Sequence, residues 1–291
     1  MQQIKRGIYY EDSYLGVTLG ALVFSHGTIL IDAPLRQEDA RSWRSALLNQ
    51  RGGTNRLLVS LDAHMDRTLG ARALECTIVA HQKTAQVFRN RPSIFKGGNQ
   101  EGGADWESYN DVVGTRWASP DLTFTQCISM NWGGPQVLLE YHPGPAAGAI
   151  WVIIPEEKVV YVGDAVTNGQ PPFLENADLP AWLDTLNVLQ THFEDYLIIS
   201  GRGGPITQES VRAQQWVLNK ILKSLNHFAR RNASPEATDD LIPTLLSEFT
   251  FPKDQFELYT QRLRTGLYQY YIHHYHPVSD VEAPVIEANI E

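Results

Sequence analysis

Short apolar runs, each bounded by polar or glycine-containing segments, recur along the first two thirds of the chain. They predict strands near Ile4–Tyr10, Leu19–Phe24, Thr28–Asp32, Arg56–Ser60, Thr77–Ala80, Leu122–Thr125, Gln136–Tyr141, Ala149–Ile154, Lys158–Val162 and Tyr196–Ser200. Apolar residues at helical spacing predict helices over Gln37–Asn49, Thr68–Arg72, Thr84–Asn90 and Leu179–Thr191. Strands and helices mixed in this order indicate an α/β sandwich, with sheets packed inside and helices outside.

The pattern becomes helical after Pro205. Helices are predicted over Ser210–Asn232, Ser234–Phe249 and Pro252–His276, two of which have a proline near the first turn. Large apolar residues repeat along the last helix, and such a stripe is most simply an interface with the core or with a second subunit. We therefore expect a core domain over residues 1–207, and a helical region over residues 208–291 that packs on this core or at a dimer interface.

The most informative segment follows the predicted strand Arg56–Ser60. There an apolar run ends in Asp62, His64 and Asp66, at alternate positions, followed at once by Arg67. Because an unpaired buried charge is costly, such residues are expected to pair with one another or to bind something. Three more polar residues stand where later strands give way to loops: His142, Asp164 and Arg202. Together they predict one assembled polar site.

At these positions the chain resembles the metallo-β-lactamase superfamily. Family members carry His-x-His-x-Asp-His after a strand, then a His near Gly or Pro, an Asp in a Gly-Asp pair, and a late Gly-His-Gly. The first motif is Asp62-Ala63-His64-Met65-Asp66-Arg67 here, so Asp62 and Arg67 replace its outer histidines. His142 and Asp164 match the next two positions, and Arg202 replaces the last histidine. The resemblance covers about residues 4–207 and implies a four-layer αββα sandwich with a C-terminal helical extension.

The resemblance also implies a metal centre. Carried over to this sequence, the first metal of a complete family site would be bound by Asp62, His64 and His142, with Asp164 alongside. The second position would be surrounded by Asp66, Asp164 and the two arginines, and arginine is not an expected ligand because it stays protonated. The implied cofactor is therefore one divalent ion, zinc in the first place and iron or manganese as alternatives, or no metal.

Three functions are open at this point. In the first, a mononuclear hydrolase, metal-bound hydroxide would attack an ester, lactone, thioester or phosphoester. Asp66 would orient or deprotonate the water, and Arg67 or Arg202 would stabilise the developing oxyanion; an anionic small molecule would suit the arginines best. The second is a non-catalytic family member whose site became an Arg–Asp salt-bridge network or an anion-binding pocket. The third is an oxidoreductase with a mononuclear iron.

The net charge of the chain limits the kinds of partner that it is expected to bind. The formal net charge of −9 argues against generic binding to nucleic acid or to an anionic membrane. Met1–Arg6 leads into polar residues rather than an apolar signal region, so we expect a cytosolic protein. Gly97–Gly103 is expected to form a loop beside the substrate cleft. Asp32 would lie beneath the metal loop and orient ligands or backbone amides, or more simply would cap a turn before Pro34.

Overall fold

Two β-sheets lie at the centre of the computed structural model, which describes residues 1–48, 50, 52–53, 55–97 and 110–276. Within these residues the first sheet has seven strands in chain order: β1 (Gln2–Lys5), β2 (Ile8–Glu11), β3 (Leu19–Val23), β4 (Gly27–Ile31), β5 (Asn55–Val59), β6 (Thr77–His81) and β7 (Leu122–Phe124). The second sheet has the order β13 (Pro205–Ile206), β12 (Leu197–Arg202), β11 (Val159–Thr167), β10 (Ile150–Ile154), β9 (Val137–Tyr141) and β8 (Cys127–Met130).

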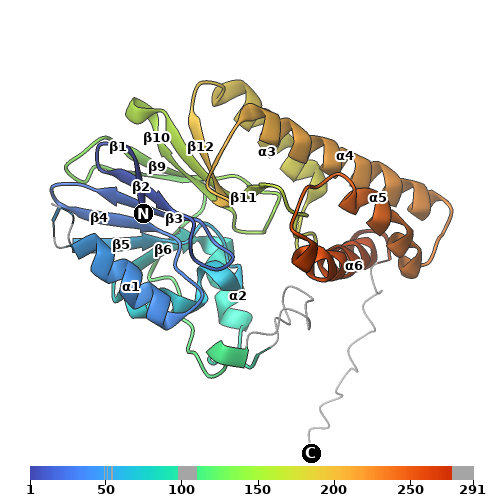
Figure 1. Ribbon diagram of the computed structural model, residues 1–291, viewed down its shortest axis with the longest axis horizontal. Coiled ribbons are helices and arrows are strands. Elements are labelled where there is room, and N and C mark those ends of the chain that lie inside the picture. The colour runs from blue at the N-terminus through green and yellow to red at the C-terminus, as the bar shows by residue number, and fades with distance from the viewer. Residues whose placement is uncertain (49, 51, 54, 98–109, 277–291) are drawn as a thin grey trace, which may run out of the picture.

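Helices cover the outer faces of both sheets (Figure 1). The α-helices are α1 (Gln37–Leu48), α2 (Gln82–Asn90), α3 (Leu179–His192), α4 (Gln208–Arg230), α5 (Ile242–Leu246) and α6 (Phe256–Tyr275). Short 3₁₀ helices are η1 (Met65–Arg67), η2 (Leu69–Leu74), η3 (Asn110–Val112), η4 (Pro155–Glu157), η5 (Pro235–Leu241) and η6 (Lys253–Gln255). The first sheet carries α1 and α2, and the second carries α3 and the C-terminal helices, so the four predicted layers are present.

The alternation of side chains along the buried strands builds these layers. In β4, Ile29 and Ile31 point into the core between the two sheets, where they meet Val152 and Tyr161 of the second sheet. Leu30, on the opposite face of β4, packs in the cluster that contains Trp43 of α1. Because both faces of β4 are covered, its last three residues, Ile29–Ile31, form an uninterrupted apolar run and do not alternate with polar residues.

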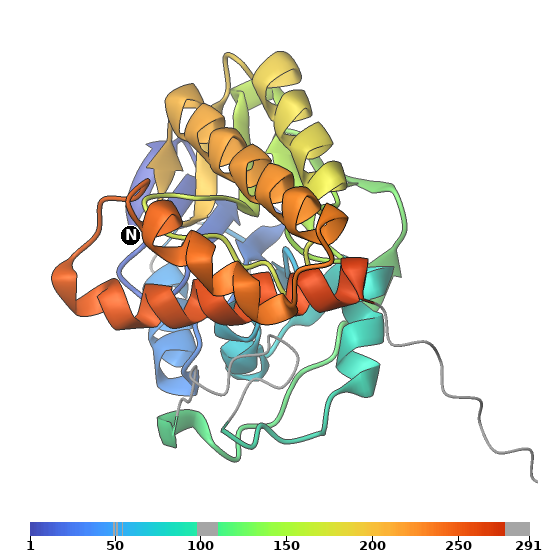
Figure 2. The ribbon, with the colours of Figure 1, turned by 90° about the vertical axis from the view of Figure 1, so that its right-hand side faces the viewer.

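The C-terminal helices share a core with the second sheet. Trp151 and Val160 of that sheet, Trp182 of α3, Leu218 of α4 and Leu267 of α6 belong to one buried cluster. Figure 2 shows α4 and α6 running across the front of this face. The apolar stripe expected on the last helix is therefore buried against the rest of the same chain in the part of the chain that the structure describes.

Several local predictions were wrong. The predicted strand Ile4–Tyr10 is two strands, because the chain turns at Gly7, whose φ is +76°. The predicted helix Thr68–Arg72 is the 3₁₀ helix η2, and the predicted helix Ser234–Phe249 is divided into η5 and the short α5, which has Pro243 in its first turn. Strands β8 and β13 were not predicted. Most of the expected loop Gly97–Gly103 lies outside the described residues.

Candidate functional site

The sequence-predicted polar residues meet where parallel strands end. Strand β4 pairs in parallel with β5, and β11 pairs in parallel with β12, so neighbouring strands deliver their carboxyl ends to the same edge. Asp32 follows β4, Asp62 lies three residues after β5, Asp164 lies in β11, and Arg202 is the last residue of β12. The carboxyl ends of parallel strands are the usual place for a site in such sheets.

Irregular backbone around Gly163 gives Arg67 room beside Asp164. The register between β11 and β12 shifts on both sides of Gly163, which has a φ of +57°. A Cβ atom at Gly163 would lie 3.2 Å from Nη1 of Arg67, and one at Gly201 would lie 2.9 Å from its Nη2. Because neither glycine has a side chain, the guanidinium group of Arg67 fits against the two strands.

Arg202 binds two aspartates at once. Its Nη1 and Nη2 donate to Oδ2 and Oδ1 of Asp66, at 2.5 and 3.1 Å. Its Nε and Nη2 donate to Oδ1 and Oδ2 of Asp164, both at 3.0 Å. The backbone carbonyl of Gly16 accepts a further hydrogen bond from Nη1 at 2.6 Å. Bidentate arginine–carboxylate pairs of this kind combine strength with fixed geometry.

Arg67 holds three more carboxylate contacts and is completely buried. Nη1 donates to Asp32 at 3.1 Å, Nη2 donates to Asp164, and Nε lies 3.3 Å from Oδ1 of Asp62. The other oxygen of Asp32 accepts a hydrogen bond from the backbone N–H of Leu61 at 2.8 Å, so Asp32 fixes both the arginine and the loop after β5. Asp164 joins the two arginines into one continuous network.

The aspartates of this network are ionised only where neighbouring positive groups outweigh the effect of burial. Burial opposes ionisation of Asp66, but Arg202 and His64 outweigh it and hold the pKa of Asp66 well below its usual range. The pKa of Asp164 is lowered in the same way by Arg202 and Arg67, against its burial. Burial dominates at Asp32 and raises its pKa to about 7, even though Arg67 acts in the opposite direction.

His64 is attached to the same network by its ring. Its Nδ1 lies 2.7 Å from Oδ1 of Asp66 and 3.3 Å from Nη2 of Arg202, so the shorter contact favours a proton on Nδ1 that is donated to the carboxylate. The backbone N–H of His64 donates to Oδ1 of Asp62 at 2.7 Å. The ring packs on Phe173 with a centroid separation of 4.5 Å.

His142 is held in a different environment. Its ring stacks on Trp151, with centroids 3.6 Å apart and planes inclined by 15°, and its Nε2 lies 3.4 Å from a carboxylate oxygen of Glu140. The following Gly144 packs against the backbone of Trp182, where a Cβ atom would approach to 2.3 Å. The loop that carries His142 is thus fixed against α3.

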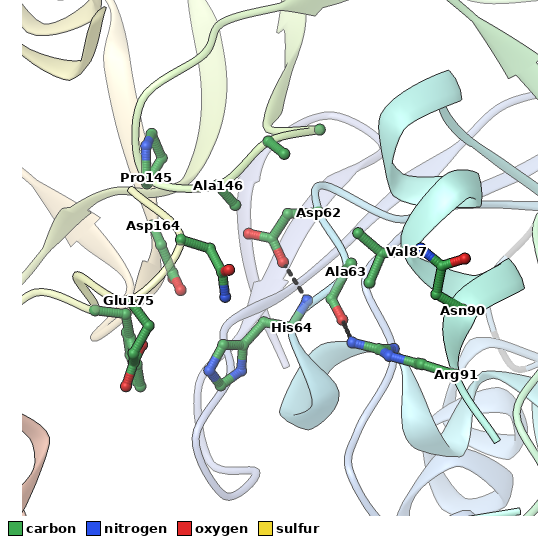
Figure 3. A pocket seen from close by; sticks show the side chains of 14 residues that line it. Asp62, Ala63, His64, Val87, Asn90, Arg91, Pro145, Ala146, Asp164 and Glu175 are labelled. Carbon is green, nitrogen blue, oxygen red and sulfur yellow. Dashed lines mark hydrogen bonds between the residues drawn. The ribbon is translucent and has the colours of Figure 1, made fainter. Parts of the chain in front are cut away.

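A cavity of about 300 Å³ opens over the network. Asp62, His64 and Asp164 line it together, as the close-up in Figure 3 shows. Its other walls come from α2 and the following residue, from the loop after β9, and from the loop before α3: Val87, Asn90, Arg91, Pro145, Ala146, Ala147, Gly148, Phe173, Glu175 and Asn176. His142 is not among the lining residues, so the structure brings together three of the four residues predicted to bind metal.

The donors of this site do not fit a resident metal ion. Among the residues that the structure describes, no three His, Cys, Asp or Glu side chains are grouped so that they could hold one. The carboxylates of Asp66 and Asp164 already accept hydrogen bonds from guanidinium groups on both of their oxygens. The predicted ligand set of Asp62, His64, His142 and Asp164 is therefore not formed. The two arginines contact Asp66 and Asp164, the carboxylates beside which the resemblance placed them.

Sequence reasoning missed two residues that complete the site. Phe173 lies against His64, and the guanidinium carbon of Arg202 lies 4.4 Å from the centre of its ring. Arg262 of α6 stands 4.0 Å from the same ring centre and donates to the carbonyl of Pro171 at 3.1 Å. The segment Pro171-Pro172-Phe173 was the only available signal, because two prolines fix the backbone before an aromatic residue.

Comparisons with known proteins agree with this fold. The family model described as "Metallo-beta-lactamase superfamily" matches residues 70–200, a range that begins just after Arg67 and ends just before Arg202. Over that range the chain is similar to the metallo-β-lactamase superfamily. The superfamily contains metal-dependent hydrolases. No curated protein matches the sequence.

Solved structures show the same architecture at low sequence identity. A metallo-beta-lactamase from Pontibacter korlensis is 17% identical, with a TM-score of 0.57 over 75% of this chain and 97% of that one. The metallo-beta-lactamase IND-7 is 18% identical, with a TM-score of 0.58 over 75% and 96%. The stereoselective inverting sec-alkylsulfatase Pisa1 from Pseudomonas sp. is 15% identical, with a TM-score of 0.66; the match covers 94% of this chain but only 49% of that enzyme. These likenesses establish the fold.

None of the helices within the described residues is both long and apolar enough to span a membrane.

Proposed function

We propose that this chain is a metal-independent ligand-binding member of the metallo-β-lactamase superfamily. One observation carries the proposal: Arg202 donates to both oxygens of Asp66 and of Asp164, the two carboxylates expected at the second metal position. A guanidinium group held in this way neutralises the carboxylates that would otherwise attract a divalent ion. The cavity above the network stays open to a small molecule.

The surroundings of Arg67 support the same reading. This arginine is 0% exposed, lies against two glycines and faces Asp32, Asp62 and Asp164. Such a side chain cannot swing away to admit a metal ion without leaving the buried carboxylates of Asp32 and Asp62 without their cation, which is strongly unfavourable. In this proposal Arg67 and Arg202 are structural cations rather than catalytic groups, and Asp66 serves to anchor Arg202 and His64.

The mononuclear hydrolase expected from the sequence is the competing function. It is favoured by the position of Asp62, His64 and Asp164 on one cavity wall. It requires a fourth donor in place of His142, which stacks on Trp151, and it requires Asp164 to exchange two arginines for a metal. The iron-dependent oxidoreductase needs the same grouping and meets the same objection.

Metal analysis distinguishes these functions. The full chain, purified without chelator, is analysed for zinc, manganese and iron, and then titrated with each ion by calorimetry. We expect substoichiometric metal and no saturable binding at the site. Stoichiometric metal that is lost in a His64→Ala variant would contradict the proposal and favour the hydrolase.

A further inference from the structure

The outer face of α4 carries a row of exposed basic and aromatic side chains. Its members follow one another at intervals of four, seven, four and three residues, so they line one side of the helix: Arg212, Trp216, Lys223, His227 and Arg230. The buried residues of α4 lie on the opposite side, where the helix packs against α3 and β11. The five exposed residues are called the basic face of α4 below.

The charges of this face are not neutralised by neighbouring carboxylates. In the described ranges of the chain, Arg212, Lys223 and Arg230 form no ion pair. Lys220, at the edge of the face, differs in this respect, because it pairs with Glu248 at 2.5 Å. The basic face therefore keeps its positive charge, although the formal net charge of the chain is −9.

The acidic residues closest in sequence do not change this balance. Helix α4 contains one of them, Glu209, in its first turn, where a negative charge is favourable to the helix dipole. Asp239, in the η5 helix that follows, pairs with Arg264 of α6 at 3.1 Å. The positive charge of the face is thus concentrated in the second half of α4, at Lys223 and Arg230.

Trp216 adds apolar area to the middle of the face. Its side chain is 63% exposed, and Arg212 and Lys220 lie one turn before and one turn after it. Exposed aromatic side chains are enriched in binding surfaces, and complementary charge determines which partner they accept. The face therefore suits an extended segment that carries both carboxylates and aliphatic side chains.

The chain itself contains such a segment. Residues 277–291, called the acidic segment below, lie outside the described residues, and they include no lysine or arginine. Their sequence places a valine or an isoleucine within two positions of every acidic residue, namely Asp280, Glu282, Glu287 and Glu291. Negative charge and aliphatic side chains thus alternate along this segment, as the basic face requires of its partner.

The acidic segment is joined to the fold beside the basic face. Tyr275, the last residue of α6, donates a hydrogen bond from its hydroxyl to Oδ1 of Asn226 in α4 at 2.9 Å. Asn226 lies three residues after Lys223 and four residues before Arg230. Figure 2 shows the C-terminal ends of α4 and α6 converging at this place. The segment therefore starts next to the most basic part of α4.

The length of the acidic segment is sufficient for the whole face. The face spans roughly 27 Å from Arg230 to Arg212 at about 1.5 Å per helical residue. Residues 277–291 can extend to about 50 Å at about 3.3 Å per residue. Attachment to α6 also gives the segment a high effective concentration at the face. A separate polyanion has no such advantage and is repelled by the net negative charge of the chain.

We propose that residues 277–291 bind along the basic face of α4 in the same chain, with carboxylates beside Lys223 and Arg230 and an aliphatic side chain on the ring of Trp216. The bound segment connects the end of α6 to the outer surface of α4. This inference goes beyond the proposed function and does not depend on it, because none of these residues lines the cavity.

Carbodiimide cross-linking of the full chain locates the segment, because the reagent joins a lysine amine to a carboxylate in direct contact. Mass spectrometry of the digested protein identifies the joined pairs, and the Lys220–Glu248 pair serves as the positive control. Lys253, exposed in η6 and also within reach of the segment, is the comparison. We expect Lys223 to be joined to Asp280 or Glu282 in a yield at least about fivefold above that of Lys253. Equal yields at the two lysines would overturn the inference.

A mixture of normal and isotopically heavy chains shows whether the contact lies within one chain. We expect the Lys223 cross-links to join peptides of the same isotopic composition. Cross-links between a normal and a heavy peptide, in the proportion expected for random pairing, would overturn the inference and identify a second copy of the chain as the occupant of the face.

Variants of the face test the role of charge. Arg212→Gln combined with Arg230→Gln should lower the yield of the Lys223 cross-links at least about threefold. Arg41→Gln combined with Arg264→Gln, which removes two exposed arginines elsewhere, should leave this yield unchanged. An unchanged yield in the basic-face variant would overturn the inference, provided that the Lys220–Glu248 cross-link shows the helix to be intact.

Fluorotryptophan labelling of the full chain tests the contact at Trp216 without cross-linking. The resonance of Trp216 is assigned with Trp216→Phe. Neutralising the segment by Asp280→Asn, Glu282→Gln and Glu287→Gln should move this resonance toward that of the free amino acid, because the ring becomes more exposed. The control replaces exposed carboxylates elsewhere, by Glu38→Gln, Glu156→Gln and Asp239→Asn, and should leave the resonance in place. A resonance that does not respond to the segment variant would overturn the inference.

Discussion

Arg202 donates to both carboxylate oxygens of Asp66, at 2.5 and 3.1 Å, in a pair whose side chains are 3% and 4% exposed. Removing one partner of a buried ion pair leaves the other charge uncompensated, which typically costs about 3–5 kcal/mol. The pair joins the loop after β5 to the end of β12, and thereby joins the two sheets.

We predict that Arg202→Met lowers the free energy of unfolding by about 3–5 kcal/mol at neutral pH, because Asp66 loses its guanidinium partner and Asp164 keeps only Arg67. Urea denaturation monitored by circular dichroism measures the change. Arg264→Met is the matched control, since Arg264 pairs with Asp239 at the surface and both side chains are nearly half exposed. An Arg202→Met protein as stable as the control would show that the network contributes little.

The titration of Asp32 should shape the pH dependence of stability. Its pKa is about 7 in the folded protein, through burial, against 3.8 for the ordinary group. The folded state therefore holds this proton more tightly than the unfolded state between about pH 4 and pH 7. The stability contributed by protonated Asp32 is present at the acidic end of that window and is lost as the pH rises through about 7, by up to roughly 4 kcal/mol.

The variant Asp32→Asn isolates this effect. An asparagine keeps a neutral side chain at all pH values and tolerates the positive φ of +58° at this position. We expect the difference in unfolding free energy between the variant and the wild type to move in favour of the variant as the pH is raised from 5 to about 8. A pH-independent difference would mean that Asp32 keeps the same ionisation throughout.

The family motif can be restored to test the scaffold. Replacing Asp62, Arg67 and Arg202 with histidine recreates His-Ala-His-Met-Asp-His and the late Gly-His-Gly. We expect this triple variant to retain zinc after gel filtration while the wild type does not, because the removed guanidinium groups free Asp66 and Asp164. Elemental analysis provides the measurement. If the folded variant stays free of zinc, the cleft has been remodelled beyond these three positions.

The contact of Arg262 with Phe173 predicts that α6 supports the cavity. Arg262→Ala removes the contact with the ring and two hydrogen bonds, to Gln170 at 2.8 Å and to the carbonyl of Pro171 at 3.1 Å. We expect a loss of about 1–3 kcal/mol in unfolding free energy and weaker binding of any cavity ligand. Arg264→Ala, two residues along the same helix and exposed, should change neither quantity. Equal effects of the two variants would exclude a specific role for Arg262.

The sequence predicted the arrangement of sheets and helices better than it predicted where single elements begin and end. Buried strands such as β10 are continuous apolar runs, so the order of the strands and the resemblance together were sufficient for the αββα architecture. Local breaks were harder, since the turn at Gly7 and the division of η5 from α5 depend on single residues within otherwise continuous patterns.

For the site, the sequence predicted which residues take part but not which side chains contact one another. Strand ends and motif positions identified the polar site residues, namely Asp62, His64, Asp66, Arg67, Asp164 and Arg202. The motif left open either a metal ion or an Arg–Asp salt-bridge network. The choice depended on side-chain geometry, namely which carboxylates the two arginines contact. Phe173 and Arg262 come from segments about 90 residues apart, and their contact is encoded only in the tertiary packing.

The positive charges at the floor of the cavity are part of the polypeptide. Unlike a metal ion taken from solution, these arginines are present in fixed number in every chain. No chelator, competing ion or lack of metal can remove them. Whatever occupies the cavity therefore meets the same floor in every folded molecule, whatever the metal supply of its surroundings.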